Sequence, residues 1–140
     1  MEQSYTVLVV DDSDLVRRTT RRMLSKHGYR VREAADADEA LGILRTPGLK
    51  IDVVLLDVVL PKKDGVRLYA DLCVRWPRIP VVFMSAYSAE ILVDLGQEDL
   101  TLPFLAKPFT IKQLAFKVRA AINLRRRRQD LRPSEPDLVW

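Results

Sequence analysis

Short apolar runs alternate with longer segments of helical spacing along the chain, and this alternation most constrains the fold. Most of the runs are dominated by Val, Ile and Leu, which is typical of strands covered on both faces. Strands are expected over residues 5–10, 29–35, 51–56, 80–84 and 104–106. Strands and helices that alternate indicate a parallel sheet with helices on both faces, and right-handed crossovers favour a doubly wound open sheet.

Five helices are expected between and after these strands, over residues 14–27, 37–44, 65–75, 89–95 and 110–126. Ser13 suits the N-cap of the first helix, and Gly28 suits the residue just beyond its end. The length of 140 residues indicates one α/β domain over residues 1–124. Residues 125–140 are expected to form a basic helix end and a flexible tail.

Composition narrows the class of protein. Hydrophobic residues make up 48% of the chain and charged residues 30%, the profile of a globular protein. No run approaches a membrane span and the first residues show no signal pattern, so a cytoplasmic location is expected. The single cysteine, Cys73, has apolar neighbours and is expected to be a buried thiol. The net charge of +4 is modest, and no direct DNA binding is expected.

The run Arg125-Arg126-Arg127-Arg128 allows two interpretations. Four arginines suit contacts with phosphates or an anionic membrane. They also suit a solvated helix end, where cations complement the helix dipole. The sequence leaves both open.

Polar residues follow four of the five expected strands at their carboxyl ends, where open α/β sheets bind ligands. The first strand leads into Asp11, Asp12 and Asp14, the third into Asp57, the fourth into Ser85 and the fifth into Lys107. Because these ends meet at one edge of a parallel sheet, the side chains are expected to lie close together.

Such a cluster suits phosphoryl transfer. Neighbouring carboxylates repel each other, and Mg²⁺ relieves this because it prefers oxygen ligands. Lys107 would add positive charge, Ser85 a hydrogen-bond donor, and a central carboxylate the nucleophile. The five glycines fit neither a P-loop nor a dinucleotide-binding spacing.

The pattern resembles the receiver domains of response regulators (CheY-like) in two-component systems, over about residues 5–124. The motifs that carry the resemblance are Asp11-Asp12, Asp57, Leu60-Pro61-Lys62-Lys63-Asp64-Gly65, Ser85-Ala86 and Lys107-Pro108-Phe109. The resemblance implies a flavodoxin-like sheet of strand order 2-1-3-4-5. It also implies a phosphoprotein that catalyses only its own phosphorylation and dephosphorylation, and so is no conventional enzyme.

The resemblance implies a role for each matching residue. Asp57 would be the phosphoacceptor, and Mg²⁺ (or Mn²⁺) would bind Asp11, Asp12, Asp57 and the backbone carbonyl of Val59. Lys107 would pair with the phosphate, next to a cis peptide bond to Pro108. Ser85 would bond the phosphate, and Phe104 would turn inward as the switch aromatic. Val59 and Tyr87, two residues beyond the acceptor and the switch hydroxyl, would flank the path of the hydrolytic water.

The resemblance also implies partners. A sensor histidine kinase or a histidine phosphotransfer protein would donate the phosphoryl group. A downstream protein, or a second copy in a homodimer, would bind the face of the fourth helix, fifth strand and fifth helix.

One enzymatic alternative remains open at this point. Asp12-Ser13-Asp14 matches the nucleophile motif of haloacid-dehalogenase-type phosphatases. Those enzymes also need an acidic pair beyond the lysine, and the acids beyond Lys107 all lie at residues 130–137.

Overall fold

The computed structural model describes residues 4–60, 65–86 and 103–130. Five parallel strands form one sheet in the order β2-β1-β3-β4-β5. The strands are β1 (Thr6–Val10), β2 (Arg30–Ala34), β3 (Val53–Asp57), β4 (Val81–Ser85) and β5 (Phe104–Ala106). The expected strand order is thereby confirmed.

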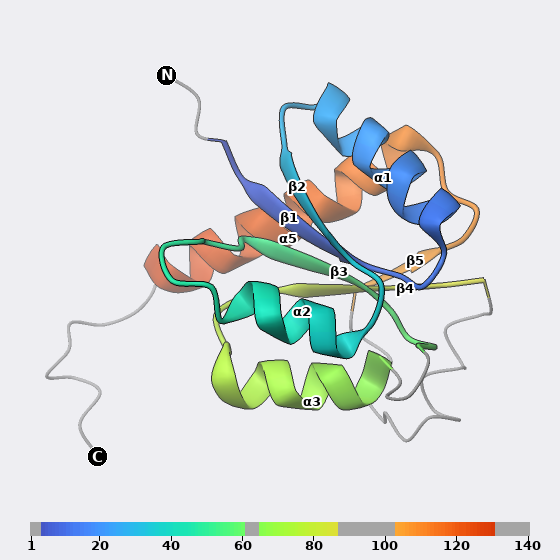
Figure 1. Ribbon diagram of the computed structural model, residues 1–140. Helices are drawn as coiled ribbons and strands as arrows, with labels where there is room; N and C mark the ends of the chain where they lie inside the picture. The colour runs from blue at the N-terminus through green and yellow to red at the C-terminus, as the bar shows by residue number, and fades with distance from the viewer. Residues whose placement is uncertain (1–3, 61–64, 87–102, 131–140) are drawn as a thin grey trace, which may run out of the picture.

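Helices cover both faces of the sheet (Figure 1). They are α1 (Asp14–Lys26), α2 (Ala37–Leu44), α3 (Gly65–Arg75) and α5 (Ile111–Asp130). Helices α1 and α5 pack on one face, and α2 and α3 on the other. The helix expected over residues 89–95 lies outside the described residues.

The central strands are buried on both faces, which explains their continuous apolar sequences. Along β1, Val7 and Val9 belong to the core beneath α1 and α5, whereas Leu8 and Val10 belong to the core beneath α2 and α3. Successive side chains of a strand point to opposite faces, so both sets must be apolar. Because each central strand is apolar and buried along its length, the polar residues that follow it lie at the carboxyl edge of the sheet.

The helix boundaries follow the local sequence. Ser13 caps α1 by accepting a hydrogen bond from the backbone N–H of Val16, and Gly28 adopts a φ of 86° just beyond the helix, as predicted. Asp36 caps α2 by accepting from the N–H of Glu39, whose carboxylate accepts from the N–H of Ala35 at 2.7 Å. These reciprocal bonds satisfy backbone donors that the helix itself leaves open.

Helix α5 runs four residues further than the expected end at residue 126. Its Arg125 is not the solvated helix end that one interpretation expected, since its side chain is only 12% exposed. It donates to the Asp52 carboxylate at 3.1 Å and to the Asp52 carbonyl at 3.3 Å. Asp52 also accepts from the N–H of Thr6 at 2.8 Å, so one buried carboxylate joins α5 to β1 and to the start of β3.

The expectation of a buried Cys73 thiol is wrong, because the side chain is exposed. The buried residues of α3 are Gly65, Leu68 and Leu72, which lie along one stripe of the helix. The residue after Leu72 is turned by about 100° around the helix axis and therefore leaves that stripe. Among the described residues, no helix is long and apolar enough to cross a membrane.

Gly65 is where α3 meets the end of β3. A Cβ added there would lie 2.1 Å from the carbonyl oxygen of Asp57 and 2.6 Å from the Cα of Val58. The N–H of Gly65 donates to the carbonyl of Val58 at 2.8 Å. Only glycine allows this close approach of two backbones.

Replacing Gly65 by alanine should therefore lower the free energy of unfolding by about 2 kcal/mol, because neither backbone moves freely. Gly42→Ala is the matched control, since nothing lies within 4 Å of its added Cβ and the residue is inside α2. The control should gain about 0.5–1 kcal/mol from its higher helix propensity. Urea denaturation measures both values, and equal shifts for the two variants would contradict the steric explanation.

Candidate functional site

The carboxyl edge of the sheet brings together residues from three separate strand ends. One carboxylate oxygen from each of Asp11, Asp12 and Asp57 lies within 4.8 Å of the others. The ammonium group of Lys107, which follows β5, lies 2.5 Å from Asp11 and 3.2 Å from Asp57. The structure thus places four of the sequence-predicted residues in one cluster.

Asp11 makes hydrogen bonds through both its backbone and its carboxylate. It is buried, with 1% of its surface exposed, and its N–H donates to the carbonyl of Ala34 on the neighbouring strand. One carboxylate oxygen accepts from the N–H of Ser13 at 2.9 Å, and the other accepts from Lys107. Its orientation is thus fixed by backbone and side-chain contacts together.

Asp57 is the last residue of β3, and its side chain is about one-tenth exposed. One carboxylate oxygen accepts from the N–H of Val59 at 3.0 Å, and the other accepts from Lys107 at 3.2 Å. The residue that follows it, Val58, donates its N–H to the carbonyl of Met84. The strand end is therefore anchored, and the Asp57 carboxylate stays largely buried beside Lys107.

Lys107 owes its position to the end of β5. Its N–H donates to the carbonyl of Ser85 at 2.8 Å, and its peptide bond to Pro108 is cis. The Lys107 side chain is only 16% exposed, so its charge is largely withdrawn from water. It lies between two carboxylates that would otherwise repel each other.

The protonation of this cluster reflects its burial. Burial raises the pKa of Asp57 above its ordinary value, although the Val59 N–H and the charge of Lys107 oppose the shift. Burial alone would lower the pKa of Lys107, but the hydrogen bond to Asp11 and the charges of Asp57 and Asp11 outweigh it and raise that pKa. Lys107 therefore stays cationic, and an ionised Asp57 lacks part of the stabilisation that water would supply.

The three carboxylates fit a divalent cation. All the ligand atoms are oxygens, the donors that Mg²⁺ prefers, and Asp12 is exposed so that its carboxylate faces solvent. A cation of charge +2 would also favour the ionised form of Asp57, which burial disfavours. The donor set is therefore consistent with a metal site.

The remaining predicted residues are placed as follows. Ser85 is buried at the end of β4, and Phe104 at the start of β5 is half-buried against the core beneath α2 and α3. Val59, two residues beyond Asp57, is 45% exposed. Tyr87 lies outside the described residues. Asp14 lies in the first turn of α1 and pairs with Arg17, outside the three-carboxylate cluster.

One residue of the site that the sequence did not indicate is Arg17, which contacts the backbone of Asp11. Its guanidinium donates to the backbone carbonyl of Asp11 at 2.6 Å and pairs with Glu33 of β2 at 3.3 Å. Arg17 follows Asp14 by three residues, a spacing that indicates an ion pair on the surface of a helix. Nothing in the local sequence indicated the contacts with Asp11 or Glu33.

The strand order and the carboxylate–lysine cluster define a flavodoxin-like α/β domain with an acidic site at its carboxyl edge. The family model of the response regulator receiver domain matches residues 7–139. The chain belongs to this family, and it is a receiver domain of a two-component signalling system, not a conventional enzyme. The haloacid-dehalogenase alternative is thereby set aside.

Individual relatives agree with this assignment. The chain is 41% identical over 120 residues to the sensor kinase CckA of Brucella abortus. The aligned residues cover 86% of this chain and 13% of the kinase. It is 35% identical over 138 residues to the response regulator MprA of Mycobacterium sp. (strain KMS), covering 96% of this chain and 56% of the regulator. The chain thus spans only part of each of these relatives.

A solved structure shows the same fold. The response regulator receiver protein from Sinorhizobium medicae WSM419 superposes with a TM-score of 0.76 at 27% identity. The match covers 88% of this chain and 98% of that one.

The raised pKa of Asp57 gives a test on the metal-free protein. Asp57→Asn removes a charge that is disfavoured in the folded state, so it should raise the free energy of unfolding near neutral pH by about 1 kcal/mol, a few degrees in Tm. As the pH falls through the raised pKa of Asp57, the wild-type carboxyl becomes neutral and the difference should disappear.

Thermal denaturation in a chelator at several pH values measures this difference. Asp12→Asn is the matched control, because Asp12 is exposed and should change stability by less than about 0.5 kcal/mol. A destabilised Asp57→Asn variant near neutral pH would show that the ion pair with Lys107 outweighs the cost of burial.

Proposed function

We propose that Asp57 accepts a phosphoryl group from the phosphohistidine of a sensor kinase or a histidine phosphotransfer protein, and that this modification changes partner binding. The observation that carries the proposal is the contact of Lys107 with both Asp11 and Asp57 at the carboxyl edge of the sheet. A carboxylate beside a fixed cation and two further acids is equipped to attack phosphorus in the presence of a metal ion.

The chemistry follows from the positions of the side chains. A carboxylate oxygen of Asp57 forms a bond to phosphorus while the phosphorus–nitrogen bond of the phosphohistidine breaks, and the electron pair of that bond stays on the imidazole. The Val59 N–H holds one oxygen of Asp57, so the direction of attack is restricted. Lys107 lies 3.2 Å from the other oxygen and would neutralise charge on the phosphoryl oxygens.

Asp11, Asp12, Asp57 and the backbone carbonyl of Val59 would hold the cation, which we infer to be Mg²⁺ or Mn²⁺. When bound, the cation supplies positive charge to the phosphoryl oxygens and to the acidic cluster. Asp11 is already oriented by Ser13 and Lys107, so it needs little rearrangement to act as a ligand.

The response would spread from the site through β4 and β5. Ser85 ends β4 beside the strand end that carries Lys107, and it would bond the phosphoryl group. Phe104 lies across from Phe83 in the register of these two strands and would turn inward. The output face would comprise the segment before β5, β5 itself and α5, where Phe116 is 70% exposed. A downstream protein or a second copy would bind there.

Treatment with acetyl phosphate and Mg²⁺ should add one phosphoryl group to the protein, at Asp57. Intact-mass measurement and peptide mapping would detect the modification and locate it. Asp57→Asn should abolish it, whereas Asp38→Asn, an exposed acid in the first turn of α2, should leave it unchanged. Equal labelling of Asp57→Asn and wild type would refute the proposed acceptor.

The phosphorylated form should lose its phosphate slowly for a receiver. Val59 offers no hydrogen bond to the incoming water, and Tyr87 occupies the second flanking position in the family pattern. A polar pair, Val59→Asn/Tyr87→Glu, should speed the decay about tenfold, since one orienting contact contributes roughly 1–3 kcal/mol to the barrier.

The decay of the phosphorylated mass after removal of the donor measures this rate. Val74→Asn is the matched control, because Val74 is 81% exposed on α3. An unchanged decay in the double variant would show that the flanking side chains do not limit access of water.

A further inference from the structure

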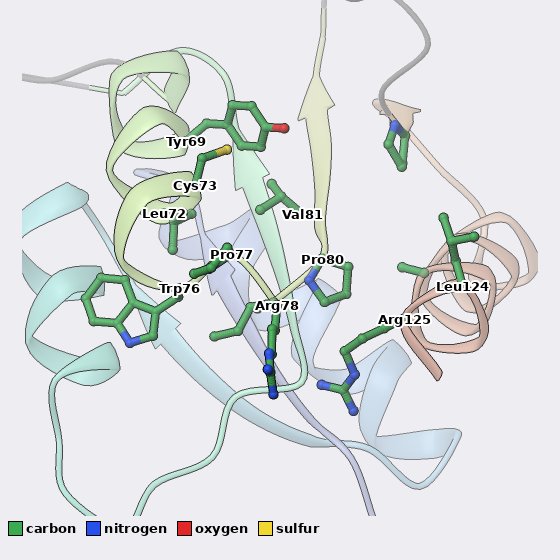
Figure 2. Close-up of a pocket in the computed structure, with 13 residues that line it drawn as sticks. Tyr69, Leu72, Cys73, Trp76, Pro77, Arg78, Pro80, Val81, Leu124 and Arg125 are labelled. Atoms are coloured by element: carbon green, nitrogen blue, oxygen red, sulfur yellow. The ribbon is translucent and has the colours of Figure 1, made fainter. Parts of the chain in front are cut away.

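A groove lies at the amino-terminal edge of the sheet, opposite the acidic cluster. It has a volume of about 330 Å³ and lies between α3, the segment from Trp76 to Val81, and the second half of α5 (Figure 2). A smaller cavity of about 300 Å³ adjoins it and shares Trp76, Arg78, Ile79 and Arg125. This pair of cavities is called the basal groove below.

The walls of the basal groove are mainly apolar and its rim is basic. Tyr69, Leu72 and Trp76 supply apolar and aromatic surface on one side, and Leu124 supplies it on the other. Leu124 remains 43% exposed, although α5 packs against the sheet around it. An apolar groove of this size suits hydrophobic side chains of a bound segment.

Arg78 and Arg125 give the groove its positive charge. Their side chains extend toward the same end of the groove in Figure 2. Arg125 forms an ion pair with the Asp52 carboxylate, but its buried Nε has no hydrogen-bond partner among the described residues. Over the part of the chain that the structure describes, no carboxylate pairs with Arg78. The groove therefore fits an occupant that is both apolar and acidic.

The chain carries a segment with this chemistry next to the groove. Residues 131–140 read Leu-Arg-Pro-Ser-Glu-Pro-Asp-Leu-Val-Trp. The acids Glu135 and Asp137 come before the hydrophobic residues 138–140. They follow α5, which ends at Asp130 and lines the groove with Leu124 and Arg125. The helix rises only about 7.5 Å over the five residue steps from Arg125 to Asp130, whereas the ten residues 131–140 could reach about 33 Å if extended. The segment is thus long enough to turn at Pro133 and return.

We propose that the basal groove binds the chain's own segment 131–140, with Glu135 or Asp137 against Arg78 and the hydrophobic residues 138–140 against the apolar walls. Attachment to α5 gives the segment a high effective concentration at the groove, so a weak contact is enough to keep the groove covered. Proline at two positions limits the conformations that the free segment must give up. The proposal is independent of phosphorylation at Asp57.

Cys73 is the natural probe, because it is the single cysteine, is exposed and lines the groove. The rate of its alkylation by a maleimide would be compared between the full chain and a chain that ends at Asp130, both in metal-free buffer. The truncated chain should react about fivefold faster or more, because a groove covered four-fifths of the time leaves the thiol open for roughly one-fifth. Equal rates would overturn the proposal.

Charge reversal distinguishes a specific contact from general crowding by the segment. Arg78→Glu should speed alkylation in the full chain, and the added changes Glu135→Arg and Asp137→Arg should slow it again. Arg22→Glu, an exposed arginine on α1, is the matched control and should have no effect. Failure of the reversed charges to restore protection would overturn the assigned contact.

Protein concentration separates the chain's own segment from other occupants. Protection that is independent of concentration supports binding within one molecule. Protection that appears only as the concentration rises would assign the groove to a second copy and overturn the proposal. If inorganic phosphate slows alkylation equally in the full and the truncated chain, and the two chains otherwise react alike, the groove is a simple anion site and the proposal is overturned.

Discussion

The position of one ammonium group between two buried carboxylates holds the functional edge of this receiver domain together. Asp11 is buried beside Asp57, and without the charge of Lys107 the two carboxylates would repel each other and could not both stay ionised. Lys107 reaches them only because β5 runs parallel to β4 and ends beside Ser85. The sheet topology and the charge cluster thus depend on each other, since each of the three strands must end at the same level.

Residues that depend on local chemistry were predictable from sequence. Asp57 ends a continuous apolar run, so both its strand and its place at the strand end could be inferred before any coordinates. The caps at Ser13 and Gly28 were equally local. The metal-competent arrangement of Asp11, Asp12 and Asp57 needed one further step, the rule that parallel strands share their carboxyl edge.

Residues that depend on tertiary contacts were not predictable in this way. Asp52 and Arg125 are 73 positions apart, so the sequence does not indicate that they pair. Arg125 begins a run of four arginines, and such a run is typical of an exposed surface. Apolar neighbours in sequence do not indicate burial of Cys73, because adjacent residues of a helix lie on different faces. Helix α5 continues to Asp130, beyond the expected end, because arginine favours helix and no proline follows before residue 133.

The contact between Arg125 and Asp52 has a consequence for the geometry of signalling. Asp52 precedes β3, the strand whose other end carries Asp57, so α5 and β3 share a contact at the edge of the sheet remote from Asp57. If phosphorylation at Asp57 displaces α5 as proposed, this ion pair would restrain sliding of the helix along its axis more than tilting about Arg125. Such a tilt would change the direction of α5 while Arg125 stays beside Asp52.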